Sequence, residues 1–273
     1  MTAAPLPVLF VPHGAPTFAL RPGDAGAAMS EFAARLPRPR AIVVISAHWE
    51  THAPTIGTTA ACTAGETIHD FWGFPERLYN LDYPAAGDPA VSQEVLQAFR
   101  QAGFAARLES NRGLDHGAWI PLRLMYPAHD IPVIPVSLQS PLGPEHHFAL
   151  GRALAGLPQR GVLVVASGNL THNLRDYQLA ARGSGTPAYV REFADWIWAH
   201  IGAKDIDLLI DYRAAAPHGA RAHPSEEHLL PLHVALGAAG EHWRAERIYS
   251  GVEDHVLAMD SFALWPDLQG KQQ

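Results

Sequence analysis

One apolar run limits the folds open to this chain more than any other stretch. It is Ala41-Ile-Val-Val-Ile-Ser-Ala-His-Trp-Glu50, in which small and β-branched residues lead into Ser46 and His48. A continuous apolar run of strand length is typical of a strand buried on both faces of a parallel sheet. Ligands of open α/β sheets bind beyond the carboxyl ends of the strands. The run therefore predicts an α/β fold and places His48 where a functional site is expected.

Two more strands end in a similar way. Residues 7–11 form an apolar run that stops in a tight loop around His13, and residues 161–167 lead through Gly168 towards His172. Proline and glycine mark tight loops of the first kind. Further strands are expected over 55–59, 105–108, 131–138, 244–251 and 256–264, the last two as a hairpin.

Helices are expected between these strands. Asp88 is a suitable N-cap residue in front of Pro89. Ser225 is a second candidate N-cap, which predicts that Glu227 and His228 lie in the first turn of a helix. The other helices are expected over 27–36, through Leu124 and Met125, and over 145–157 and 187–201.

Composition supports one domain over residues 1–273, with a mostly parallel central sheet flanked by helices. The chain is 48% hydrophobic, which is enough for a full core. It is only 17% charged with a net charge of -7, which argues against a nucleic-acid surface. No apolar run is long enough for a membrane span, and the N-terminus lacks the pattern of a signal peptide. The single cysteine, Cys62, excludes an intrachain disulfide, so a cytoplasmic location is expected.

Histidine is the one overused polar residue, with 16 copies against 20 lysines and arginines. Several lie in polar contexts and are interpreted as solvated surface: His52, His129, His146, His147, His218 and His242. Five others end strands, lie in glycine-flanked loops or precede a helix: His13, His48, His116, His172 and His228. The carboxyl ends of parallel strands share one edge of a sheet, so these five are expected to converge there.

A histidine cluster with few cysteines suits zinc, iron, copper or nickel better than magnesium or calcium. Zinc favours a tetrahedral site with a water in the open position, whereas Fe(II) oxygenases favour two histidines and one carboxylate. Glu227 beside His228 leaves both options open. The sequence contains no HExxH, CxxC, P-loop, GxGxxG or GxSxG motif, so the common metalloprotease, nucleotide-binding and α/β-hydrolase functions lack their signatures.

Six short motifs together resemble the class III extradiol ring-cleavage dioxygenases, and more closely their DOPA-dioxygenase branch. In chain order they are Pro12-His-Gly-Ala-Pro16, Ser46-Ala-His-Trp49, Thr67-Ile-His-Asp-Phe71 with Gly73-Phe-Pro75, Asp115-His-Gly-Ala-Trp119, Ala166-Ser-Gly-Asn169 with His172-Asn173, and Glu227-His-Leu-Leu-Pro231. They span nearly the whole chain. Pro12 and Ala15 stand where relatives often carry glycine and serine.

The resemblance implies a role for each histidine. His13, His48 and His228 match the metal ligands, with Glu227 as the alternative third ligand. His172 matches the residue assigned to acid–base work and is also a candidate fourth ligand. His116 matches a histidine that helps to position the substrate. The resemblance further implies one divalent metal, Zn²⁺ or Fe²⁺, at the carboxyl edge of the strands.

The implied reaction is oxygen insertion into a catechol-type ring, which gives a muconic semialdehyde. Turnover is expected to need Fe²⁺, because Zn²⁺ has no redox chemistry. Trp49, Phe71 and Phe74 are expected to contact the small aromatic diol, unless the aromatic loop plugs the core instead. Two other functions stay open: a zinc-dependent hydrolase and a non-enzymatic binding protein of the Memo type. The sequence also leaves room for a homo-oligomer.

Overall fold

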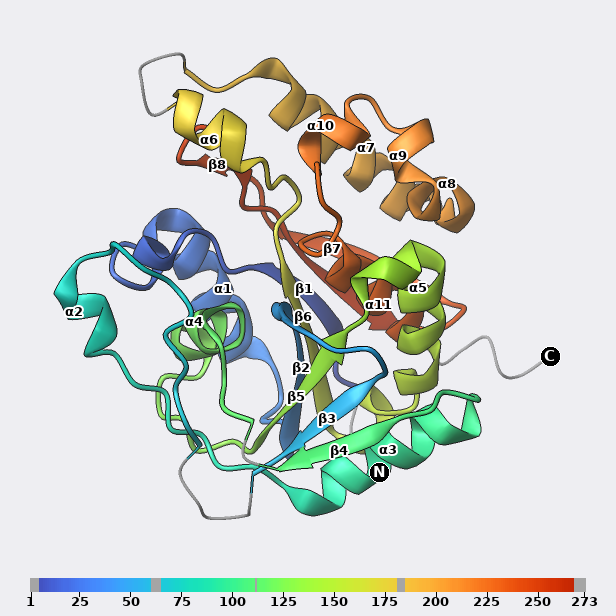
Figure 1. Ribbon diagram of the computed structural model, residues 1–273. Helices are drawn as coiled ribbons and strands as arrows, with labels where there is room; N and C mark the ends of the chain where they lie inside the picture. The colour runs from blue at the N-terminus through green and yellow to red at the C-terminus, as the bar shows by residue number, and fades with distance from the viewer. Residues whose placement is uncertain (1–4, 60–64, 111, 181–184, 268–273) are drawn as a thin grey trace.

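The computed structural model of the protein describes residues 5–59, 65–110, 112–180 and 185–267, and they fold around one eight-stranded sheet (Figure 1). The strand order is β4-β3-β5-β2-β6-β1-β10-β7. The four central strands run parallel to one another: β5 (Val133–Leu138), β2 (Ala41–Glu50), β6 (Val162–Gly168) and β1 (Val8–Pro12). This arrangement confirms the predicted α/β fold with a mostly parallel sheet.

Antiparallel pairs appear only toward the two edges of this sheet. On one side, β10 (Ser261–Pro266) pairs with β1 and with β7 (Trp243–Tyr249), which confirms the predicted final hairpin. On the other side, β3 (Thr55–Thr58) joins β5 to β4 (Arg107–Ser110). A small ribbon of β8 (Val252–Glu253) and β9 (Leu257–Ala258) interrupts the chain between β7 and β10.

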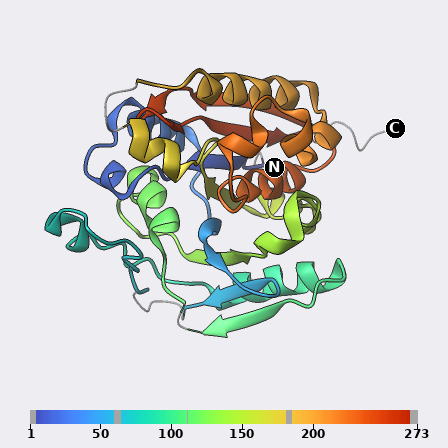
Figure 2. The same cartoon turned by 45° about the horizontal axis from the view of Figure 1, so that its top comes forward.

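Helices cover both faces of the sheet. On one face α1 (Gly23–Arg35) packs against α4 (His116–Met125). On the other lie α3 (Pro89–Gln101), α5 (Gly143–Leu154) and α11 (Leu230–Ala238). Figure 2 shows α7 (Ala188–Ala203) along the antiparallel end of the sheet. The shorter helices are α2 (Glu76–Tyr79), α6 (Leu174–Ala180), α8 (Ile206–Ile210), α9 (Tyr212–Ala215) and α10 (Gly219–Ala222).

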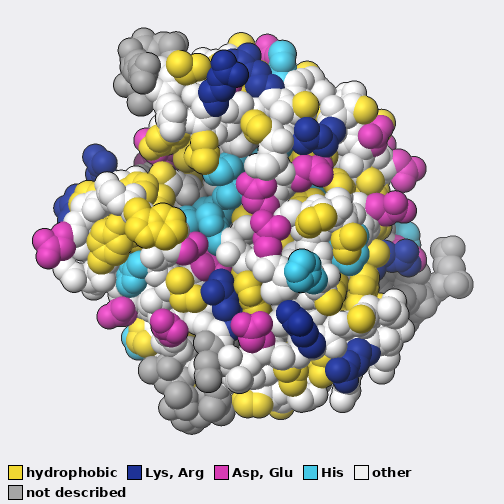
Figure 3. Space-filling model, viewed as in Figure 1, with side chains coloured by type: hydrophobic (Ala, Val, Ile, Leu, Met, Phe, Trp, Pro, Cys, Tyr) yellow, Lys and Arg dark blue, Asp and Glu magenta, His cyan; other side chains and the backbone are white. Residues whose placement is uncertain are grey.

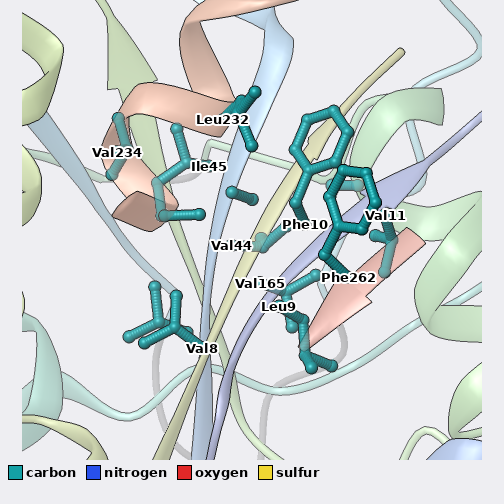
Figure 4. Packing of buried hydrophobic residues seen from close by; sticks show 14 of the residues in the cluster. Val8, Leu9, Phe10, Val11, Val44, Ile45, Val165, Leu232, Val234 and Phe262 are labelled. Atoms are coloured by element: carbon teal, nitrogen blue, oxygen red, sulfur yellow. The ribbon is translucent and has the colours of Figure 1, made fainter. Parts of the chain in front are cut away.

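Strand β2 lies in the middle of the core. Residues 41–45 of β2 are fully buried, between β5 and β6 in the sheet and between helices above and below it. Phe10 of β1 stacks on Phe262 of β10 with ring centroids 6.0 Å apart (Figure 4). Burial on both faces explains why β2 has a continuous apolar sequence instead of an alternating one. Among the described residues, no helix has the length and apolar character needed to cross a membrane.

Two local predictions were wrong. Ser225 does not cap a helix, because residues 226–229 form a turn and α11 begins only at Leu230. Ser225 Oγ instead donates a hydrogen bond to Glu227 Oε1 at 3.0 Å. His147 is not on the surface but is fully buried in α5. By contrast, Asp88 caps α3 as expected, since its carboxylate accepts hydrogen bonds from the backbone of Ala90 and Val91.

The buried His147 leads to a prediction about stability at acidic pH. Its Nδ1 donates to Gly143 O at 2.6 Å and its Nε2 accepts from Gln139 N at 3.1 Å, so the neutral ring satisfies both nitrogens. Burial lowers the pKa of His147 to about 3. Below pH 6.5 the unfolded chain therefore binds a proton that the folded chain excludes. The free energy of unfolding is therefore expected to fall as the pH drops from about 6.5 towards 3. At pH 5.5 the contribution of His147 to this loss is about 1.4 kcal/mol.

Urea unfolding of the metal-free protein at pH 7.5 and 5.5 measures this effect. His147→Gln is expected to be less stable at both pH values, but to lose about 1.4 kcal/mol less than the parent protein on acidification. If both proteins lose the same free energy of unfolding between pH 7.5 and 5.5, His147 is not the cause of the loss.

Candidate metal centre

The fold brings the five singled-out histidines together at the carboxyl edge of the parallel strands. His13 follows the last residue of β1, and His48 lies near the end of β2. His172 lies in the loop that follows β6, while His116 is the first residue of α4. His228 stands in the turn before α11. Figure 3 shows histidine side chains gathered in a hollow of the surface.

Three of these rings form a nearly equilateral triangle. Ring centroids are 4.9 Å apart for His13 and His48, 5.1 Å for His13 and His228, and 5.0 Å for His48 and His228. The two remaining rings flank the triangle. The ring of His116 lies 3.9 Å from that of His48, and the ring of His172 stacks on that of His228 at 3.5 Å.

Hydrogen bonds fix the protonation of the His13 ring. Ser167 Oγ donates to Gly117 O at 2.5 Å, so it accepts from His13 Nδ1 at 3.1 Å. The proton of the neutral His13 ring is therefore on Nδ1, and the lone pair of its Nε2 faces the other histidines. Partners of this kind orient the histidines of metal sites.

Asp70 favours the same tautomer of His48. Its Oδ2 atom lies 3.4 Å from His48 Nδ1, and the negative charge of the carboxylate favours a proton on that nitrogen. The Nε2 atoms of His13 and His48 then face each other at 3.1 Å with both lone pairs directed inward. Two lone pairs at this distance repel each other unless a cation lies beside them. Two nitrogens bound to one zinc at a tetrahedral or octahedral angle are about 2.8 to 3.4 Å apart, a range that includes the observed distance.

The third corner of the triangle follows the same rule. Glu227 Oε1 lies 3.1 Å from His228 Nδ1, which leaves Nε2 of His228 as the free donor atom. The turn that carries both residues packs tightly on β6, because Asn169 N donates to His228 O at 3.0 Å. A Cβ atom on Gly168 would lie 2.1 Å from His228 O. Only glycine therefore allows the turn to approach the sheet closely enough to deliver His228.

Asp70 also holds His116. The Oδ1 atom of Asp70 accepts from the backbone N of His116 at 2.9 Å and from its Nδ1 at 3.0 Å. Burial alone would raise the pKa of Asp70, but its bonds to His116 and the nearby His48 lower it to about 2. The sequence by itself pointed to no role for Asp70. The available signal was its place in the Thr67–Phe71 motif, next to the predicted pocket residue Phe71.

Burial keeps four of the histidine rings neutral near pH 7: His13, His48, His172 and His228. It is the largest cause that lowers the pKa of His48 to about 3 and that of His172 to about 4. Burial and neighbouring histidines also hold the pKa values of His13 and His228 well below the usual 6.5. Metal binding requires unprotonated imidazole, so these rings do not have to release protons before they bind an ion.

The donor set fits a divalent transition metal. His13, His48 and His116 offer ligand atoms within 4.8 Å of one another, and so do His172, Glu227 and His228. The triangle of His13, His48 and His228 spans both groups. Imidazole donors suit zinc and iron, and Glu227 adds one carboxylate to the candidates.

A cavity of about 620 Å³ opens onto the cluster. Phe71 and Phe74 line it, together with His48, His116, His172, Glu227 and His228. Trp72, which is 84% exposed, and Leu174 also line it, although neither was among the expected contact residues. Trp49 is absent from the described lining residues. It is buried, with Arg112 over its ring at 5.0 Å, because alternation along β2 turns it away from the face that carries His48.

Comparison with known proteins agrees with this site. Residues 23–258 match the family model described as the catalytic LigB subunit of aromatic ring-opening dioxygenase. A 4,5-DOPA dioxygenase extradiol from Beta vulgaris is 40% identical over 226 residues, covering 82% of each chain. A protein of the same name from Escherichia coli K12 is 38% identical over 242 residues, covering 87% of each.

A solved structure shows the same fold. The crystal structure of an uncharacterised protein from Escherichia coli K12 superposes with a TM-score of 0.77 at 31% identity, over 94% of this chain and 99% of that one. The family match and these relatives show that the chain belongs to the LigB family of extradiol aromatic ring-opening dioxygenases.

Proposed function

We propose that this enzyme is a metal-dependent extradiol dioxygenase that opens the ring of a small catechol to a muconic semialdehyde. The observation that carries the proposal is the His13–His48–His228 triangle, in which His48 and His228 line an aromatic-lined cavity. Both atoms of O₂ enter the product, so the reaction needs no external reductant. Relatives named 4,5-DOPA dioxygenase make DOPA a first substrate to test.

His13, His48 and His228 would hold the ion, with Glu227 orienting His228 through its Nδ1. Bound Fe²⁺ would supply a common binding point for the catechol oxygens and O₂, and a path for electrons between them. Phe71 and Phe74 line the same cavity and would exclude water from one face of the ring.

His172 is proposed as the group that accepts a catechol proton. Burial lowers the pKa of His172 to about 4, so the ring is neutral at neutral pH and keeps a nitrogen lone pair that can accept a hydrogen bond from a catechol hydroxyl. The ring lies parallel to that of His228 at 3.5 Å, which places it at the edge of the triangle. His116, fixed by Asp70 on the opposite side, would bond to a substrate oxygen.

Metal exchange tests the proposal directly. The Fe²⁺-loaded protein is expected to consume O₂ when DOPA or another catechol is added, with a yellow semialdehyde as the coloured product. The Zn²⁺-loaded protein is expected to bind the catechol without consuming O₂, because zinc is not redox-active. Hydrolysis of an ester by the Zn²⁺-loaded protein, together with no O₂ uptake by the Fe²⁺-loaded protein across a panel of catechols, would favour a hydrolase instead.

A further inference from the structure

The loop that carries His172 is bound to a distant segment of the chain. Residues 221–223, at the end of α10, run beside residues 170–173, which follow β6 (Figure 1). His172 N donates to Ala222 O at 2.9 Å. The side-chain amide of Asn173 donates to a second carbonyl of the same segment at 2.7 Å, across 48 positions of the chain. The place of His172 in the site therefore depends on this segment.

A buried histidine completes the connection. The side chain of His223 is fully buried, and its Nε2 donates to Leu170 O at 2.7 Å. Its Nδ1 has no partner among the described residues, so the bond to Leu170 O is the one hydrogen bond of this ring. The rings of Phe193 and Tyr212 pack around it, with centroids at 5.7 and 6.0 Å. Packing fixes the ring of His223, and that ring fixes the carbonyl two residues before His172.

His172 differs from the other four rings of the cluster in how it is held. Among the described residues, no side chain forms a hydrogen bond with its ring, which stacks on His228 at 3.5 Å with 8° between the planes. A stacking contact fixes the direction of a ring less than a hydrogen bond does, because a hydrogen bond weakens steeply off its axis. The backbone therefore largely sets the direction of the His172 ring. The other four rings are held by Ser167, Asp70 and Glu227.

We propose that His223 is a positioning residue for His172: its single hydrogen bond to Leu170 O holds the loop so that the His172 ring lies over His228 at the edge of the triangle. His223 is not among the residues that line the cavity, so it acts through the loop and not on the substrate. The expected effect on turnover rests on the proposed ring-cleavage function. The expected effect on the position of the ring does not.

The chain offers a matched control in His233. This residue is also fully buried, and its Nε2 donates to a backbone oxygen, that of Leu209, at 3.0 Å. Leu209 belongs to α8, which carries none of the cluster histidines. Leucine in place of either histidine removes one buried N–H donor of the same kind. Only His223→Leu removes a bond to the loop of His172.

The position of the His172 ring can be measured without turnover. In the Zn²⁺-loaded full chain with ¹³C-labelled histidine, stacking on His228 is expected to shift the ring protons of His172 to high field, because they lie over a second aromatic ring. The spectrum of His172→Gln identifies these signals by their loss. His223→Leu is expected to lose most of the shift. His233→Leu is expected to keep it, and so is His223→Gln, whose amide can still donate to Leu170 O.

Turnover measures the consequence for catalysis. In the Fe²⁺-loaded protein, His223→Leu is expected to lower kcat for catechol-dependent O₂ uptake by roughly 10–100-fold, because the ring that accepts the catechol hydroxyl is displaced. The KM for the catechol and the metal content are expected to stay at parent values, since the triangle is intact. His223→Gln is expected to retain most of the parent kcat. His233→Leu is expected to keep the parent kcat, although both leucine variants should unfold at lower urea concentrations than the parent.

Three results would decide against the inference or against the function on which it draws. Parent-like His172 signals in folded His223→Leu would overturn the positioning role, and so would an equal loss of the shift in His233→Leu. If His223→Leu does not fold, His223→Asn removes the same bond, because its amide is too short to reach Leu170 O, and the same outcomes apply. If the parent protein takes up no O₂ with any catechol, ring cleavage is wrong, and the His172 signals still decide the role of His223.

Discussion

Replacing His48 with alanine is expected to abolish both metal binding and catechol-dependent O₂ uptake. The substitution removes one corner of the histidine triangle and leaves the lone pair of His13 without its neighbour at 3.1 Å. Loss of an outer partner of a metal ligand typically costs 10–100-fold in metal affinity or activity, and loss of the ligand itself is expected to exceed that range.

His52→Ala is the matched control for this experiment. His52 lies four residues along the chain, is exposed, and is not among the residues that line the cavity. Elemental analysis after metal loading should find about one ion per chain for the parent protein and the control, and close to none for His48→Ala. Full metal content in His48→Ala would contradict the proposed ligand set, and would direct attention to the group of His172, Glu227 and His228.

Replacing His172 with glutamine is expected to reduce kcat by about 10² to 10⁴-fold while the metal content stays at the parent level. Glutamine keeps a polar side chain of similar length but cannot accept the catechol proton. The three rings of the triangle are held by other groups: His13 bonds to Ser167, His228 bonds to Glu227, and His48 lies beside the Asp70 carboxylate.

Chemical rescue separates catalysis from structure in this variant. Added imidazole is expected to restore part of the O₂ uptake of His172→Gln, because a free base can enter the cavity beside His228. A variant that loses its metal together with its activity would identify His172 as a fourth ligand. A variant with parent-level kcat would exclude the proposed role in proton transfer.

The carboxylate of Asp70 links two rings of the histidine cluster. It contacts His48 and His116 at once and thereby sets the direction of both rings. The family resemblance identified the motif that contains Asp70, but the function of a carboxylate in a motif depends on which nitrogen it reaches. That contact joins residues 46 positions apart in the chain, so it becomes visible only after β2, the 65–75 segment and α4 are assembled.

Local sequence determined the strands and much of the site. The apolar residues 41–45 predict a strand buried on both faces, and the structure places them fully buried between β5 and β6. His13, His48 and His172 were expected at one sheet edge because parallel strands present their carboxyl ends together, and they lie there. These features depend on hydrophobic burial and strand direction, which short segments of the sequence specify.

Tertiary structure alone decided what surrounds the histidines. The proton on His13 is fixed by Ser167, which lies 154 positions away, and His228 reaches the site only because Gly168 leaves room for its backbone. The side of β2 that faces the cavity separates His48 and Glu50 from the adjacent Trp49. The apolar run at β2 thus specified a strand with a histidine near its end. The tautomers, charges and open face around that histidine come from packing between distant segments, which no local pattern encodes.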